Sequence, residues 1–142
     1  MPPLQSITTS ETITSPSNPR VRNTSKLRDA TTRRQTGLTL IDGQREIHRC
    51  LVAQKEITEV FFDADSFSSL SDTEQTDLTS IVTQASAKGA AVTPLSSRPF
   101  SKIAFGNRNE GIVAVARFRA ETLADFKPRP NSPIFLLEGI EK

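Results

Sequence analysis

The alternation of short strand patterns with amphipathic helical patterns constrains the fold of this chain more than any other feature. Four segments have the length and apolar pattern of short β-strands: residues 38–42, 58–62, 90–94 and 112–118. Two longer segments between them have the apolar spacing of amphipathic helices: residues 44–54 and 71–89. Strands that alternate with helices in this way predict an α/β fold, a small layered α/β sandwich with a mixed sheet.

The ends of the chain differ in composition from this alternating part. The first residues are rich in Ser, Thr and Pro, and Asn18-Pro19 then predicts the start of a polar helix that runs to about Thr31. Near the other end, a stretch with three prolines precedes Ile134–Glu138, which has the pattern of a buried strand. The predicted order is a flexible N-terminal extension at 1–17, a folded domain at 18–126, a linker at 127–133 and the start of a further domain at 134–142. We therefore expect this chain to be part of a longer protein.

The single cysteine and the single histidine exclude several classes of protein. Cys50 cannot form an internal disulfide, which favours a reducing compartment, and with His48 alone beside it a Cys/His zinc cage is excluded. No apolar run approaches the roughly 20 residues that cross a bilayer, and the start lacks the pattern of a signal peptide. The sequence predicts a cytoplasmic protein with no membrane partner, and no motif assigns a catalytic, cofactor-binding or metal-binding residue.

The net charge of +2 conceals a separation of charge along the chain. Residues 20–55 carry nine basic and three acidic groups, whereas residues 56–87 carry seven acidic groups and no Lys or Arg. A basic segment of this kind attracts a polyanion, and arginine suits bidentate contact with phosphate. The candidate RNA-binding residues in it are Arg20, Arg22, Lys26, Arg33, Arg34, Arg45 and Arg49. Asn107 and Arg108, in a glycine-flanked loop before the last strand, are candidates for contact with base edges or ribose.

Five segments, taken in order, resemble the SpoU/TrmH-type RNA 2′-O-ribose methyltransferases of the SPOUT superfamily. They are Ile13–Arg22 (ITSPSNPRVR), Arg33–Gly37 (RRQTG), Ile41–Ile47 (IDGQREI), Lys102–Ala116 (KIAFGNRNEGIVAVA) and Phe135–Lys142 (FLLEGIEK). The resemblance implies that residues 18–126 form an RNA substrate-binding domain akin to ribosomal kink-turn-binding proteins. It also implies that Arg33, Arg34 and Arg45 occupy basic positions of the family, and that Arg108 is the arginine of its loop.

The same resemblance implies a two-part enzyme in its full-length form. A knotted catalytic domain would follow Lys142, bind S-adenosylmethionine, carry the catalytic residues and form a homodimer. That domain is expected to be absent from this chain, so that the chain itself binds no cofactor and its partner is RNA, either rRNA or tRNA. We therefore expect the RNA-recognition part of a ribose methyltransferase.

Two alternatives remain open on the sequence alone. The chain could be a stand-alone RNA-binding module of the kink-turn class, with no methyltransferase domain. It could also be a protein-interaction domain whose working face is the acidic block at 56–87, in which case charge reversal at Asp63, Asp65 or Glu74 would abolish binding.

Overall fold

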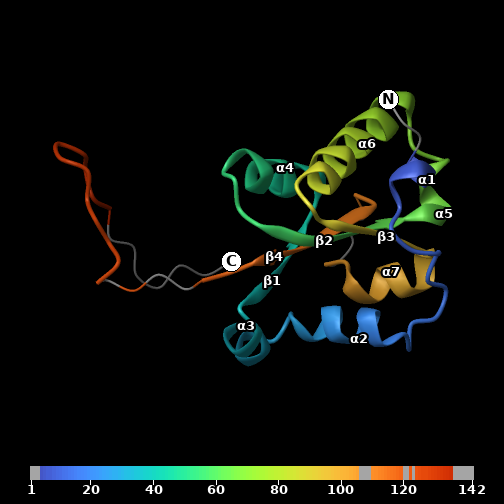
Figure 1. Ribbon diagram of the computed structural model, residues 1–142, viewed down its shortest axis with the longest axis horizontal. Coiled ribbons are helices and arrows are strands. Elements are labelled where there is room, and N and C mark those ends of the chain that lie inside the picture. Colours follow the sequence, from blue (N-terminus) through green and yellow to red (C-terminus); the bar gives the residue numbers. More distant parts are fainter. Residues whose placement is uncertain (1–3, 106–109, 120–121, 123, 136–142) are drawn as a thin grey trace.

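The protein forms one four-stranded mixed sheet with helices on both faces (Figure 1). The computed structural model describes residues 4–105, 110–119, 122 and 124–135. The strands are β1 (Leu38–Asp42), β2 (Ile57–Asp63), β3 (Ala91–Leu95) and β4 (Ile112–Arg117), in the spatial order β1-β4-β2-β3. Strand β4 is antiparallel to β1 and β2, whereas β2 and β3 are parallel. The predicted α/β class and mixed sheet are confirmed.

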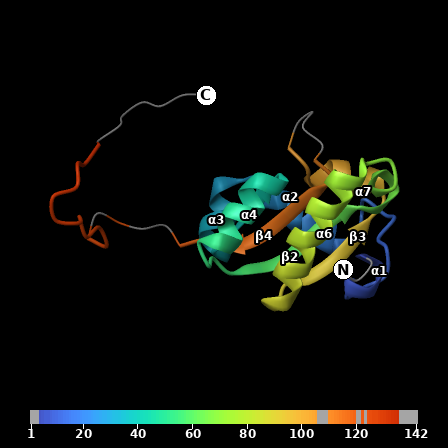
Figure 2. The same ribbon diagram turned by 90° about the horizontal axis from the view of Figure 1, so that it is seen from above.

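Helices cover the sheet in two layers, which Figures 1 and 2 show from two directions. The helices are α1 (Leu4–Ile7), α2 (Pro19–Lys26), α3 (Ala30–Thr36), α4 (Gln44–Val52), α5 (Ala64–Phe67), α6 (Asp72–Ala87) and α7 (Ser97–Ile103). Helices α1, α4 and α6 pack on one face, where Ile47, Leu78 and Val82 are buried. Helices α2 and α7 pack on the other face, with Val21 and Phe100 buried in its core. The two buried clusters make the molecule a layered sandwich. No knotted domain is present within the described residues.

The N-terminal segment is folded against the sheet, so the prediction of a flexible extension at residues 1–17 is wrong for residues 4–13. Leu4 is buried, the Thr9 amide donates to the Val92 carbonyl at 2.9 Å, and Ile13 forms a parallel bridge with Leu95. The reason is the position of β3 at the edge of the sheet, where backbone groups need partners. Three widely spaced apolar residues in a Ser/Thr-rich segment give no strand period, and the pairing is set by the edge instead.

The single helix predicted over residues 19–31 is two helices. Asn18 caps α2 as predicted, but α2 ends at Lys26 and Asp29 caps a second helix by accepting from the Thr32 amide at 2.7 Å. An Asp side chain competes for backbone amides in this way and favours a new helix start. Arg33 and Arg34, which follow the predicted end of the helix, therefore lie in the last turn of α3, which ends at the left-handed Gly37.

Smaller differences concern short elements. Two short helices, α5 and α7, lie in segments where the apolar spacing predicts neither of the two longer helices. Ile134 and Phe135 belong to no strand and are 62 % and 81 % exposed, while the rest of the strand predicted there lies outside the described residues. None of the helices among the described residues has both the length and the apolar character to cross a bilayer.

Candidate nucleic-acid interface

The sheet separates the predicted basic residues into two groups. Arg22, Lys26 and Arg34 lie on α2 and α3, on one side of the sheet, whereas Arg45 and Arg49 lie on α4 on the other side (Figure 1). Strand β1 connects the two groups, since α3 precedes it and α4 follows it. The structure thus places Arg22, Lys26 and Arg34 on one side of the sheet and does not join the seven basic residues predicted between 20 and 49 into a single patch.

The cations of α2 and α3 that remain available to a ligand are Arg22, Lys26 and Arg34. Each is exposed, and within the part of the chain that the structure describes none has a side-chain hydrogen bond or ion pair. Arg22 and Lys26 are one helical turn apart, so their side chains share a face of α2, while Val21 and Thr24 point into the core. We call these three residues the α2–α3 cations.

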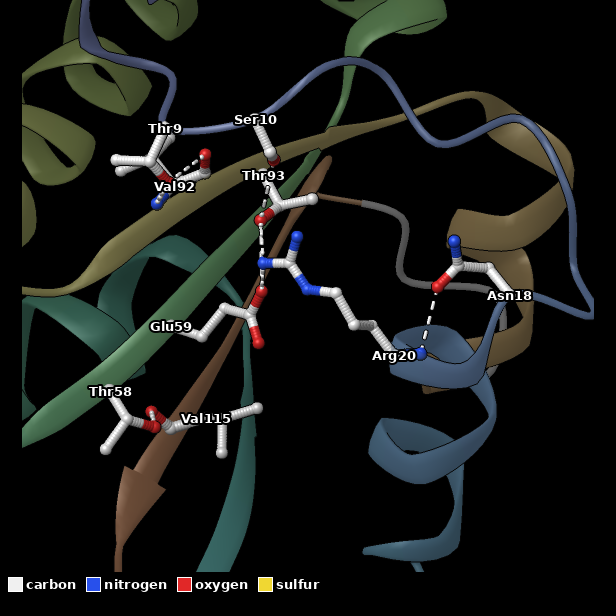
Figure 3. Close-up of polar contacts among 9 residues, drawn as sticks. All are labelled: Thr9, Ser10, Asn18, Arg20, Thr58, Glu59, Val92, Thr93 and Val115. Carbon is white, nitrogen blue, oxygen red and sulfur yellow. Dashed lines mark hydrogen bonds and ion pairs between the residues drawn. The ribbon is translucent and has the colours of Figure 1, made fainter.

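Arg20 is held inside the fold (Figure 3). Its Nη2 donates to Glu59 Oε1 on β2 and to Thr93 Oγ1 on β3, and the Thr93 hydroxyl also donates to Glu59 Oε1 at 3.0 Å. The Arg20 side chain is 40 % exposed and that of Glu59 is 20 % exposed. Arg20 therefore ties the first turn of α2 to the sheet. No local pattern marks this pairing, because Glu59 is 39 residues away along the chain.

Arg33 closes the junction between α2 and α3. Its Nη1 donates to the carbonyls of Leu27 at 3.0 Å and Arg28 at 2.7 Å, just after the end of α2. The last carbonyls of a helix lack intrahelical partners, so a guanidinium placed there stabilises the junction. Arg34, the next residue, is exposed and makes no such contact among the described residues.

This difference between neighbours gives a prediction about stability. Arg33→Ala removes two hydrogen bonds and should lower the free energy of unfolding by about 1 kcal/mol. Arg34→Ala, the matched control with the same change of charge and helix propensity, should stay within about 0.5 kcal/mol of wild type. Urea unfolding followed by circular dichroism measures both. Equal losses for the two variants would show that Arg33 does not close the junction.

A second candidate region lies at the end of the sheet where β1, β2 and β3 terminate. The Phe105 amide donates to Asp42 Oδ2, and the Gln44 amide at the start of α4 donates to Glu110 Oε2 at 2.8 Å. The residues on both sides of the predicted RNA-contacting loop are thereby fastened to the β1–α4 turn. Asn107 and Arg108 themselves lie outside the described residues, and their role stays a prediction. Arg45, beside this turn, pairs with its neighbour Glu46.

Arg28 and Phe105, which are far apart in the sequence, contact each other in this region. Arg28 Nη2 donates to the Ala104 carbonyl, and its guanidinium carbon lies 5.0 Å from the centre of the Phe105 ring. That distance is within the range of a cation–π contact. Sequence reasoning did not single out Phe105, and the long separation from Arg28 leaves no local signal that could have found the contact.

Asp42 makes the free energy of unfolding depend on pH. Burial raises the pKa of Asp42, and the nearby carboxylates of Glu110 and Glu46 add to the rise, against the Phe105 amide and Arg28, which lower it. An acid whose pKa is higher in the folded state binds more protons folded than unfolded over the intervening pH range. Stability contributed by this group is therefore lost as the pH rises through that range.

We accordingly expect Asp42→Asn to become more stabilising, relative to wild type, as the pH increases from about 4 to 7. The amide of Asn retains an acceptor for the Phe105 amide but carries no charge. Urea unfolding of both proteins at intervals across this range measures the difference. A difference that shrinks or reverses with rising pH would mean that the ionised carboxylate stabilises the fold.

The three acids named for a protein-binding face all have hydrogen-bond partners within the chain, although Asp65 and Glu74 are exposed. Asp63 is buried and accepts from Ser97 Oγ at 2.9 Å, and Asp65 Oδ2 accepts from the Ser97 amide at 2.8 Å. Glu74 forms a capping box with Ser71 at the start of α6. Among the described residues, no three His, Cys, Asp or Glu side chains are arranged to hold a metal ion. The geometry gives these acids structural partners.

Comparisons with known proteins agree with the fold and with the resemblance in sequence. A family model described as the MRM3-like substrate binding domain matches residues 18–114. A solved RNA 2′-O ribose methyltransferase is 26 % identical, with a TM-score of 0.64, and the match covers 87 % of this chain and 43 % of that one. No curated protein shows a significant match.

Two further solved structures share the fold at lower identity. An rRNA methyltransferase from Sinorhizobium meliloti is 18 % identical, with a TM-score of 0.66, over 83 % of this chain and 40 % of that one. The SpoU methyltransferase AviRb from Streptomyces viridochromogenes, in complex with AdoMet, is 18 % identical, with a TM-score of 0.53, over 79 % of this chain and 40 % of that one. This chain thus spans about two fifths of the length of the structures that it matches. The family model covers most of the described fold, from the cap of α2 into β4, and the chain belongs to the MRM3-like substrate-binding domain family.

Proposed function

We propose that residues 18–126 bind RNA as the substrate-recognition domain of an S-adenosylmethionine-dependent RNA 2′-O-ribose methyltransferase. The name of the family and the rRNA methyltransferases that share its fold support this proposal and make rRNA the substrate to test first. We also propose that the full-length enzyme has a catalytic domain, which residues 134–142 would begin. That domain would bind the cofactor, transfer the methyl group and form a homodimer. The role of residues 18–126 is to dock the RNA so that a ribose hydroxyl reaches that catalytic site.

The observation that carries the proposal is the availability of Arg22, Lys26 and Arg34. These three cations are exposed on one side of the sheet, and none of them has an anionic partner among the described residues. Phosphate groups can therefore bind to them without breaking a native contact. Arg20 and Arg33 are assigned to the fold because their guanidiniums already bind internal acceptors. Phosphate contacts of this kind position an RNA, while loops and RNA shape supply specificity.

The triple variant Arg22→Gln/Lys26→Gln/Arg34→Gln tests the assignment. Each lost phosphate contact lowers the slope of log affinity against log salt by about 0.7–0.9, so the slope should fall by about two units. At low salt the affinity should fall by about 10- to 100-fold. Fluorescence anisotropy with a labelled rRNA hairpin, between about 50 and 200 mM KCl, measures both quantities.

A matched control removes the same number of charges elsewhere. Lys55→Gln/Lys127→Gln/Arg129→Gln changes three exposed cations that lie outside α2 and α3. We expect this control to retain most of the wild-type slope and affinity. If the two triple variants lost the same slope, binding would depend on total charge, and the α2–α3 cations would have no special role.

A further inference from the structure

An irregularity in β2 places two polar side chains side by side beneath α2 and α3. Ile57 pairs with Ala116, but the next pair is Glu59 with Val115, so Thr58 is an extra residue on β2. An extra residue on one strand is a β-bulge, which redirects side chains and is frequent near functional sites. Thr58 and Glu59 consequently line the same cavity, on the α2–α3 face of the sheet.

This cavity has a volume of about 490 Å³, within the size range of small-ligand sites. Leu27, Leu38 and Val115 form its apolar part, and Asn23 and Lys26 of α2 lie at its wall. Lys26 is one of the α2–α3 cations, so the cavity opens beside the surface proposed to hold the RNA backbone. We call this cavity the bulge pocket.

Glu59 is a fixed acceptor in the bulge pocket. Its Oε1 accepts hydrogen bonds from Arg20 Nη2 and from the Thr93 hydroxyl, which hold the carboxylate in place (Figure 3). Its Oε2 has no hydrogen-bond partner among the described residues and is not fully buried, since no buried side-chain oxygen in the described structure lacks a partner. The Arg20 side chain beside it is 40 % exposed, and a guanidinium is a planar group on which a base can stack.

We propose that the bulge pocket binds one unstacked RNA base that carries an amino group, with Glu59 Oε2 as the acceptor. A carboxylate accepts from the exocyclic amino group of cytosine, adenine or guanine. Uracil offers a single N–H, which lies between two carbonyl oxygens. The negative charge of Glu59 repels those oxygens. The apolar wall suits the base face, and unpaired bases are the usual target of sequence-specific RNA recognition. The inference rests on the proposed RNA-binding function and assigns it a base preference.

The first test uses nucleosides, which lack the phosphates that the α2–α3 cations would bind. Cytidine, adenosine and uridine are titrated separately into the ¹⁵N-labelled chain, and amide shifts are followed by NMR. Cytidine and adenosine should shift the amide signals of Asn23, Thr58 and Glu59, and uridine at equal concentration should shift them at least about threefold less. No shifts at these amides, or equal shifts with uridine, would overturn the proposal.

Two variants at Asn23 test whether the base lies in the bulge pocket. Asn23→Trp fills the bulge pocket without changing its charge and should abolish the cytidine-induced shifts. Asn23→Ala, the matched control, leaves the space open and should preserve them. Thermal unfolding of both variants verifies that they fold. Cytidine-induced shifts that persist in folded Asn23→Trp would place the base elsewhere and overturn the assignment.

The second test separates this proposal from RNA binding as such. Wild type should bind a labelled 12-nucleotide oligocytidylate at least about fivefold more tightly than an oligouridylate of equal length. Asn23→Trp should bring this ratio near one while the salt slope stays unchanged. Salt-dependent binding with no preference in wild type would overturn the pocket and leave the RNA proposal standing. If wild type bound the rRNA hairpin but neither oligonucleotide, the pocket alone would be overturned. If it bound none of the three, the RNA-binding function and the base pocket that rests on it would both fail.

Discussion

Replacing Leu4 with Ala is expected to lower the free energy of unfolding by about 2–5 kcal/mol, the range for truncating a buried leucine. Leu4 is 5 % exposed and belongs to the core cluster on the α4–α6 side of the sheet. Its loss would also loosen the segment that follows, where the Thr9 amide bonds to Val92 and the Ser96 amide bonds to Ile13. Chemical unfolding monitored by circular dichroism gives the difference directly.

Val52→Ala is the control for this experiment. Val52 is also an apolar residue, but its side chain at the end of α4 is 69 % exposed, so its truncation should change stability by less than about 0.5 kcal/mol. The flexible extension that the composition of residues 1–17 predicts would make Leu4→Ala as silent as Val52→Ala. A silent Leu4→Ala would therefore support the sequence-based prediction against the observed packing.

The part of the fold that the sequence predicts well is the part that depends on local periodicity. The helices near 44–54 and 71–89 and the four strands follow from apolar spacing and capping residues, which are properties of short windows. The β3 edge partner does not follow, because Ile13 and Leu95 are far apart in sequence and the segment has no strand period. The division of α2 from α3 depended on a single capping residue, Asp29, within a polar stretch.

The candidate interface shows the same division. Charge along the chain correctly marks α2 and α3 as basic, yet it does not distinguish Arg34, which is exposed, from Arg33, which binds backbone carbonyls. That distinction depends on where a side chain meets the end of another helix. The Arg20–Glu59 pair and the bulge at Thr58 depend on strand register, which a single sequence does not encode locally. Local charge therefore locates the surface, and tertiary contacts decide which cations are available.

Asp63 provides the second large expected effect. It is 2 % exposed, and its Oδ1 accepts from the amides of Asp65 and Ser66 at 3.1 and 3.3 Å, while its carboxylate also accepts from Ser97 Oγ. Asp63→Ala leaves these donors without a partner in a buried site and should lower the free energy of unfolding by about 2–4 kcal/mol. The loss would fall on the contacts that join β2, α5 and α7. Urea unfolding at neutral pH measures it.

Asp77→Ala is the matched control, because Asp77 belongs to the same acidic block but is exposed on α6, with no side-chain partner among the described residues. Its replacement should change stability by less than about 0.5 kcal/mol. A protein-binding face centred on the acids would instead leave Asp63→Ala stably folded and impair partner binding. If Asp63 instead has a structural role, Asp63→Ala loses stability whether or not a partner is present. A stable Asp63→Ala would therefore restore the acidic face as a working surface. A destabilised Asp63→Ala would assign the most buried of these acids to the framework of the fold.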